Sequence, residues 1–146
     1  MAVDNAAAAA GLEPGLPLAS ARALCPDLTV ADDEPAADLA LLQAIADWCD
    51  RFTPLVALDE PDGLLLDISG CAHLFGGEAA LMQSVCEGLA RQGFAVSAAI
   101  AATACCARAL RRIRHGDIVS GGGEAMAVAA LPVFALGADE VVIRAL

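Results

Sequence analysis

The sequence has 146 residues, which sets an expectation of one compact unit, and 58% of them are apolar, enough for a buried core. The net charge at pH 7 is −11, and the eight basic residues are all arginine. Because phosphate contacts need lysine and arginine, this balance argues against a segment that holds nucleic acid by itself.

The cysteines do not form a pattern of paired spacings. They stand in apolar or helical contexts, which predicts free thiols in a reducing compartment, and we therefore expect a cytoplasmic protein. The longest apolar run, residues 94–107, is shorter than the roughly 18–20 residues that a membrane-spanning helix needs.

The first third of the chain is predicted to be helical. Residues 6–10 are alanines and predict a short helix that stops at the glycine after them. Pro17 precedes a second short helix over 18–24. The clearest helix is expected over 38–52. Its apolar face is formed by Leu41, Ile45, Trp48 and Phe52.

Strands enter in the middle of the chain. Residues 55–58 and 64–68 are predicted to form two strands joined by the turn 59–63, which is rich in Asp, Pro and Gly. A helix is expected over 78–91, and the alternating pattern of residues 94–101 predicts a further strand.

The last third is predicted to begin with a capped helix. Thr103 is expected to cap a helix that runs to about Ile113, and residues 118–119 are expected to form a short strand. After a glycine hinge, helices are predicted over 124–130 and 138–146. This order of elements favours an α+β fold, with helices packed on one face of a mainly antiparallel sheet.

Several motifs in this order resemble the Y-family, or translesion, DNA polymerases, in particular proteins of the ImuB type. Residues 11–17, Gly-Leu-Glu-Pro-Gly-Leu-Pro, are similar to the family's fingers motif, and 25–28, Cys-Pro-Asp-Leu, follow at the expected distance. Residues 61–69, Pro-Asp-Gly-Leu-Leu-Leu-Asp-Ile-Ser, resemble its palm motif. Residues 99–101 and the helix after them resemble the family's later strand and lysine-bearing helix. Residues 70–77 are similar to the ImuB type in particular.

The resemblance implies three regions. A partial fingers subdomain is expected over residues 1–35, and a ferredoxin-like palm over 36–120. The start of a helical thumb is expected over 121–146.

The palm motif departs from the family where metal binding is concerned. The family has an Asp-Glu pair for metal binding, and the Asp of this pair lies five residues before a second Asp. The matching residues here are Asp62, Gly63 and Asp67. Glycine thus stands where the family has the glutamate. Asp59 and Glu60 form another Asp-Glu pair, but Asp59 lies eight residues before the second Asp. We interpret Asp62 and Asp67 as a vestigial metal site. A structural explanation is open for both, since Asp before Gly is common in turns and an Asp can cap a strand end.

The positions matching the family's triphosphate contacts are altered as well. Asn5 and Ala8 stand where the resemblance implies a tyrosine-type hydroxyl and an arginine, and Ala104 stands where it implies a lysine. Arg108 matches a second basic position and is retained. It belongs to the candidate DNA or phosphate contacts, Arg108, Arg111 and Arg112. The alternative for these arginines is a solvated helix face.

These losses imply a protein that is not an enzyme, namely a non-catalytic adaptor in error-prone translesion synthesis, SOS mutagenesis and DNA repair, with no cofactor. Implied partners are damaged DNA, held weakly by this segment alone, a C-family error-prone polymerase, a RecA-like accessory protein, and a sliding clamp contacted through a region beyond residue 146. Two alternatives stay open. One is an active Y-family DNA polymerase that binds Mg²⁺ through Asp59 and Glu60 or through Asp62, and the other is a purely structural protein-interaction module.

Overall fold

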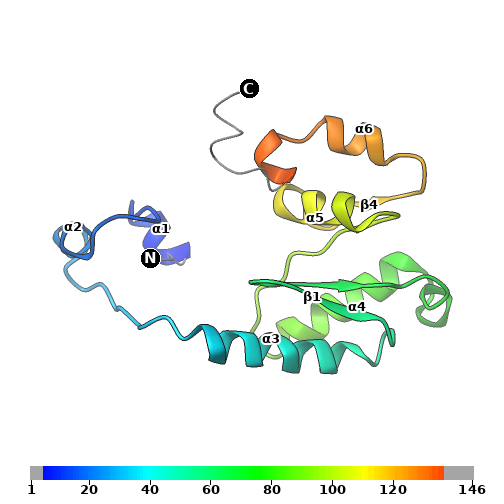
Figure 1. Cartoon of the computed structure of the whole chain (residues 1–146), viewed down its shortest axis with the longest axis horizontal. Helices are drawn as coiled ribbons and strands as arrows, with labels where there is room; N and C mark the ends of the chain where they lie inside the picture. The colour runs from blue at the N-terminus through cyan, green and yellow to red at the C-terminus, as the bar shows by residue number, and fades with distance from the viewer. Residues whose placement is uncertain (1–4, 137–146) are drawn as a thin grey trace. The chain divides into compact units, whose positions relative to one another are not determined.

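The computed structural model describes residues 5–136, and its chain divides into two compact units, 1–35 and 36–146, which we describe separately. Helices and small sheets are mixed within it, which confirms the predicted α+β class (Figure 1). The assignment of fingers, palm and thumb regions stays a prediction. The helix predicted over 138–146 lies outside the described residues.

The first unit contains two short helices, α1 (Asn5–Ala9) and α2 (Leu18–Leu24). Gly11 ends α1 as predicted, because its φ of +85° suits glycine and lets the chain turn back on the helix. The N–H of Gly11 bonds the carbonyl of Ala8 at 3.0 Å, and the N–H of Leu12 bonds that of Ala7 at 3.1 Å. These two bonds form a Schellman motif, which satisfies carbonyls that the helix end would leave unpaired.

The second unit begins with a helix, a hairpin and another helix. Helix α3 (Pro35–Cys49) leads to the antiparallel pair β1 (Val56–Asp59) and β2 (Gly63–Leu66), which confirms the predicted hairpin. The short 3-10 helix η1 (Ala72–Phe75) then precedes α4 (Glu78–Ala90).

The apolar face of α3 differs by one position from the predicted one. Leu41 is 49% exposed, whereas the neighbouring Leu42 is buried together with Cys49. The helix starts three residues earlier than predicted, at Pro35, because proline suits the first turn, where its missing N–H has no helical partner. It also ends earlier, because the N–H of Phe52 bonds the carbonyl of Cys49 in a closing turn.

A second layer of the same unit is built around α5 (Ala104–Ile113). It contains the parallel pair β3 (Ile100–Ala101) and β4 (Ile118–Val119), followed by α6 (Glu124–Ala129) and the 3-10 helix η2 (Val133–Leu136). The buried residues at its centre are mostly small: Cys106, Ala109, Leu110, Leu131 and Ala135. Alanine buries little apolar area, so burial contributes less free energy of folding to this core than to one built of leucine.

The expected single, mainly antiparallel sheet is wrong for the described residues. The two strand pairs form separate sheets, and only Ile100–Ala101 of the predicted strand 94–101 joins a ladder. The backbone of Ala98 bonds instead to the turn after α5, with its N–H donating to Nδ1 of His115 at 3.1 Å and its carbonyl accepting from Gly116 at 2.8 Å. Burial still alternates from Phe94 to Ala98, which is the pattern that made this segment resemble a strand.

Helices α3 and α4 meet at a glycine. The indole of Trp48 lies so close to Gly88 that a Cβ there would be 2.8 Å from Cζ2 and would also overlap Cη2. The ring is held on other sides by Phe52, with centroids 5.3 Å apart, and by the guanidinium of Arg51, 4.4 Å from the ring centroid. Gly88 therefore sets how closely the two helices approach.

We predict that Gly88→Ala lowers the free energy of unfolding. The overlap should cost about 1–3 kcal/mol, which exceeds the roughly 1 kcal/mol that alanine gains in a helix. Urea denaturation measures the difference. Gly121→Ala is the control, because a Cβ there would meet only Ala102 Cβ at 4.0 Å. Equal stability of the two variants would contradict the packing described.

Candidate functional site

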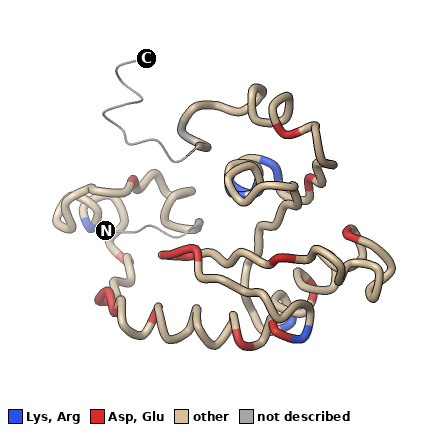
Figure 2. The backbone as a smooth tube through the Cα atoms, turned by 45° about the vertical axis from the view of Figure 1, so that its right-hand side comes forward, with Lys and Arg blue, Asp and Glu red and all other residues tan. Residues whose placement is uncertain are grey.

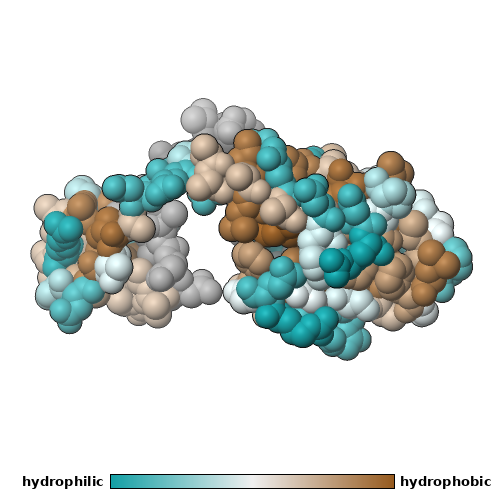
Figure 3. Space-filling model, turned by 90° about the horizontal axis from the view of Figure 1, so that it is seen from below, coloured by the Kyte–Doolittle hydropathy of each residue, from teal (hydrophilic) through white to brown (hydrophobic). Residues whose placement is uncertain are grey.

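Acidic side chains are spread along most of the chain, whereas basic ones occupy few places, and α5 carries a group of them (Figure 2). Large apolar side chains also reach the surface of both units (Figure 3), among them Leu24, Leu74 and Met126. Within residues 5–136 no helix is long and apolar enough to cross a bilayer.

The turn between β1 and β2 presents two carboxylates. Asp59 ends β1 and pairs with Gly63, the first residue of β2, at the closed end of the hairpin. The side chain of Asp59 is 15% exposed, whereas that of Asp62, within the turn, is 75% exposed. One carboxylate is therefore set against the protein, and the other lies at its surface.

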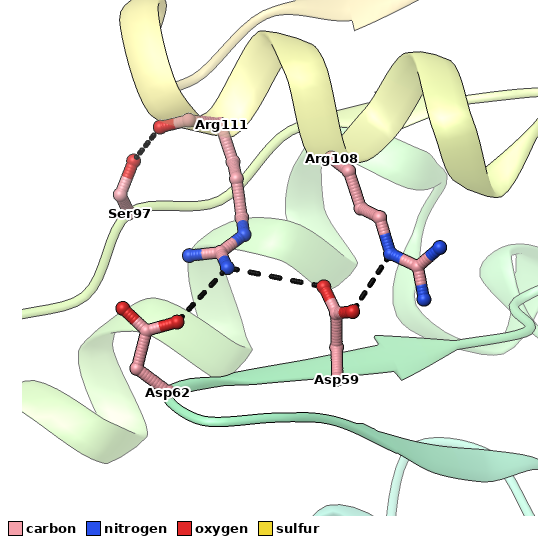
Figure 4. A network of polar contacts seen from close by, with 5 residues as sticks. All are labelled: Asp59, Asp62, Ser97, Arg108 and Arg111. Atoms are coloured by element: carbon pink, nitrogen blue, oxygen red, sulfur yellow. Dashed lines mark hydrogen bonds and ion pairs between the residues drawn. The ribbon is translucent and has the colours of Figure 1, made fainter. Parts of the chain in front are cut away.

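Helix α5 directs two arginines at this turn (Figure 4). Arg108 and Arg111 lie three residues apart and so share one face of the helix. The start of α5 is fixed by Thr103, whose hydroxyl accepts from the N–H of Cys106 and confirms the predicted cap. Near its end, the carbonyl of Arg111 accepts a hydrogen bond of 2.6 Å from the hydroxyl of Ser97.

The arginines and carboxylates form one cluster of four charges. Nη2 of Arg111 donates a hydrogen bond of 3.2 Å to Oδ1 of Asp62 and lies 3.8 Å from Oδ2 of Asp59. Nε of Arg108 lies 2.7 Å from Oδ1 of Asp59, but its N–H is not aligned with that oxygen, so the contact is an ion pair without a hydrogen bond. The formal charges of these side chains cancel.

Gly63 makes the close approach of Arg111 possible. A Cβ at this position would lie 2.9 Å from Nη2 and 3.3 Å from Cζ of Arg111, and 3.0 Å from the carbonyl oxygen of Asp59. The φ of Gly63 is not positive, so the backbone itself does not require glycine. The absence of a side chain at position 63 is thus explained by the guanidinium beside it.

The structure does not bring Asp67 to this cluster. Asp67 follows the last residue of β2, and the four residues of that strand lie between it and Asp62, which sets the two about 16 Å apart. Its carboxylate accepts from the N–H of Ser69 at 2.9 Å, and its carbonyl accepts from the buried hydroxyl of Thr53. Hydrogen bonds from Ser69, chiefly that of its backbone, hold the pKa of Asp67 below its ordinary value.

The three arginines predicted to contact DNA face different surroundings. Arg108 and Arg111 are engaged with the hairpin turn, whereas Arg112 is exposed and makes no ion pair with any described residue. Arg114, next along the chain, pairs with Asp117 at 3.7 Å. Arg112 is therefore the arginine of this group that is available to a phosphate without first breaking a contact.

Two of the remaining family-matched positions supply no polar side chain. Ala8 lies in α1 and Ala104 is the first residue of α5, and each presents only a methyl group. Asn5 begins α1, and its side chain lies outside the described set.

A cavity that the sequence did not predict opens beside the cluster. Its volume is about 540 Å³, and Asp62, Arg108 and Arg111 form its polar part. Apolar residues of α3, β2 and α4, together with the extended segment 94–101, form the rest. The spacing of Arg108 and Arg111 is a sequence signal for this place, because it puts both on one helix face.

The cysteines form no further site. All six are free, as predicted: Cys25, Cys49, Cys71, Cys86, Cys105 and Cys106. Burial raises the pKa of Cys49, Cys86 and Cys106, which disfavours the reactive thiolate. Among the described residues, no group of three or more His, Cys, Asp or Glu side chains could hold a metal ion.

Comparison with known proteins identifies the family. Residues 1–112 match the impB/mucB/samB family, and the chain belongs to that family. The resemblance to Y-family polymerase-like proteins of the ImuB type is thereby confirmed.

This chain spans less than a third of the length of the relatives that it matches. Protein ImuB of two Caulobacter vibrioides strains is 52% identical over 127 residues, which is 86% of this chain and 28% of the relative. DNA polymerase IV 2 of Mesorhizobium japonicum is 36% identical over 76 residues, which is 52% of this chain and 18% of that protein. No solved structure matches the chain.

We predict a pH dependence from Asp67. Since its pKa is lower in the folded protein than in the unfolded chain, its charge stabilises the fold above the unfolded pKa of about 3.9, and this contribution is lost as pH falls through the folded pKa. The difference in Tm between wild type and Asp67→Asn should therefore be largest above about pH 5 and shrink toward pH 3. Thermal melts across that range measure it, and a difference that grows in acid would contradict the prediction.

Proposed function

We propose that this chain is part of a non-catalytic, Y-family polymerase-like accessory protein that acts in error-prone translesion synthesis and SOS mutagenesis. The observation that carries the proposal is the pairing of the hairpin carboxylates with arginines of α5, at the motif that resembles the metal-binding strand of a palm. Two-metal phosphoryl transfer needs carboxylates that are free to hold cations against a triphosphate. Here Asp59 and Asp62 face guanidinium groups, and Gly63 offers no side-chain oxygen.

Membership of the impB/mucB/samB family and the likeness to Protein ImuB support a role in translesion synthesis. In this proposal the second unit is a ferredoxin-like palm, residues 1–35 are part of a fingers subdomain, and residues from 121 begin a thumb. The partners are a C-family error-prone polymerase, a RecA-like protein and, through a region beyond residue 146, a sliding clamp. The proposed location is the cytoplasm, which the free cysteines support, and the proposal requires no cofactor.

One comparison favours an alternative. The likeness to DNA polymerase IV 2 suggests an active polymerase that binds Mg²⁺ through Asp59 and Glu60, or through Asp62. The geometry disfavours this reading, because Asp59 is 2.7 Å from Arg108 and Asp62 is 3.2 Å from Arg111. An arginine at such a distance would have to withdraw before the carboxylate could hold a cation.

We predict that the full-length protein does not extend a primer in the presence of Mg²⁺, because its hairpin carboxylates are neutralised and the metal-binding glutamate is missing. A primer-extension assay on damaged and undamaged templates measures this, with an active Y-family polymerase as the positive control. Synthesis that is lost in Glu60→Ala but retained in Asp62→Ala would establish the alternative and overturn the proposal.

We further predict which arginine contributes to DNA binding. Replacing Arg112 by alanine in the full-length protein should lower the slope of log affinity against log salt by about 1, since this exposed side chain is free to meet a phosphate. Arg111→Ala should change the slope less, because Arg111 is already paired with carboxylates. The salt dependence of DNA affinity, measured by fluorescence anisotropy, separates the two.

Arg91→Ala serves as a control at the end of another helix, since Arg91 is exposed and its one ion pair within residues 5–136 is with Glu87 at 3.8 Å. A slope that none of Arg108, Arg111 and Arg112 affects would favour the second alternative, a protein-interaction module that does not contact DNA through this helix.

A further inference from the structure

We infer that Arg111 takes the place of a divalent cation between Asp59 and Asp62, and that Gly63 is the residue that makes room for it. The inference builds on the proposed non-catalytic function and assigns that function a residue-level cause. It rests on three observations, namely a shared contact, a missing side chain and a balanced set of charges.

The first observation is the shared contact. The same nitrogen, Nη2 of Arg111, lies 3.2 Å from Asp62 and 3.8 Å from Asp59 (Figure 4). Two carboxylates drawn together by a turn repel each other, and a positive charge between them removes the repulsion. A bound cation would do the same, but here the charge comes from a side chain of the protein itself.

The second observation is the space at Gly63. Any side chain there would start 2.9 Å from Nη2, closer than a Cβ and a nitrogen can pack. Because the φ of Gly63 suits other residues as well, the guanidinium, together with the Asp59 carbonyl at 3.0 Å, accounts for the glycine. A carboxylate-bearing residue at position 63 and Arg111 in its present place are mutually exclusive.

The third observation is the charge balance. Arg108 lies 2.7 Å from Asp59 and supplies a second guanidinium, so a divalent cation would meet two positive groups beside two negative ones. Mg²⁺ also needs several oxygen ligands around it, and the glycine contributes none from a side chain. The residues present therefore do not fit the metal that the family's palm motif implies.

The geometry favours a role for charge over hydrogen bonding. The Nε–H groups of Arg108 and Arg111 are shielded from solvent and have no hydrogen-bond partner within the described structure. An arginine chosen to form the strongest ion pair would use its fork in a bidentate contact. Arg111 instead reaches both carboxylates with one nitrogen, the arrangement expected of a group that substitutes for a bridging ion.

A double-mutant cycle in the full-length protein tests the steric half of the inference. Gly63→Ala should lower Tm by roughly 1–3 °C in the wild-type background, since the new methyl displaces Arg111 from the carboxylates. In the Arg111→Ala background the same change should lower Tm by less than half as much. The effect that is left comes from the contact of the new Cβ with the Asp59 carbonyl oxygen. Arg112→Ala is the matched control on the same helix and should leave the effect of Gly63→Ala unchanged. An equal effect of Gly63→Ala in the wild-type and Arg111→Ala backgrounds would overturn the inference.

Titration with Mn²⁺, followed by electron paramagnetic resonance, tests the electrostatic half and does not depend on Gly63→Ala folding. Wild type should show no saturable binding at this site, whereas the double variant Arg108→Ala, Arg111→Ala, which lacks both guanidinium groups, should gain a weak site that Asp62→Asn removes again. Wild-type binding that Asp62→Asn abolishes would overturn the inference, and so would the absence of any gain in the double variant.

The two claims can fail separately. Primer extension by wild type would refute the proposed function, whatever the double-mutant cycle shows. If the protein has no polymerase activity but Gly63→Ala has the same effect in both backgrounds, only the role of Arg111 is refuted.

Discussion

Arg111 reaches from the last turn of α5 to the closed end of the hairpin, and the arrangement of the second unit depends on this contact. It joins residues 49 positions apart in the chain, Arg111 and Asp62, and so ties the hairpin layer to the layer built on α5. The two layers have separate strand pairs, and no ladder hydrogen bond runs between those pairs. A few charged side chains therefore connect the two layers, which a continuous sheet would otherwise join through backbone hydrogen bonds. Ion pairs that solvent still reaches, such as that of Asp62, each contribute only about 0–1 kcal/mol, so the cluster orients the layers more than it stabilises them.

Local signals in the sequence predicted helix ends well where residues close in the sequence determine them. Helix α2 has the predicted bounds, Gly11 ends α1, and Thr103 caps α5. Each of these depends on backbone groups a few residues away. The prediction for segment 94–101 was wrong over most of its length, because a strand also needs a partner edge, and the polar groups of Ala98 found theirs in the turn at His115. Leu41 was assigned to the core for a related reason, since a periodic pattern leaves the exact rotation of a helix undetermined.

The candidate site was predictable only in part. The resemblance pointed to Asp62, Gly63 and Arg108, and the structure places all three around one cavity. It could not reveal that Asp59, set aside because of its spacing, is the least exposed carboxylate of the cluster and contacts two arginines. Nor could it show that Asp67 faces the other end of the strand and is engaged by Ser69. The position of Asp59 depends on which way a side chain leaves a turn, and that of Asp67 on which groups meet it at the far end of the strand, and spacing along the chain encodes neither of these contacts.

The contact between Trp48 and Gly88 gives the protein an internal optical probe. Trp48 is the single tryptophan of the sequence and there is no tyrosine, so fluorescence excited near 295 nm (a general property of indole) would report on one ring alone. That ring touches α4, Phe52 and Arg51 at once. Its emission would follow the separation of α3 and α4 without any label, and binding of a partner near these helices could be read from the unmodified chain.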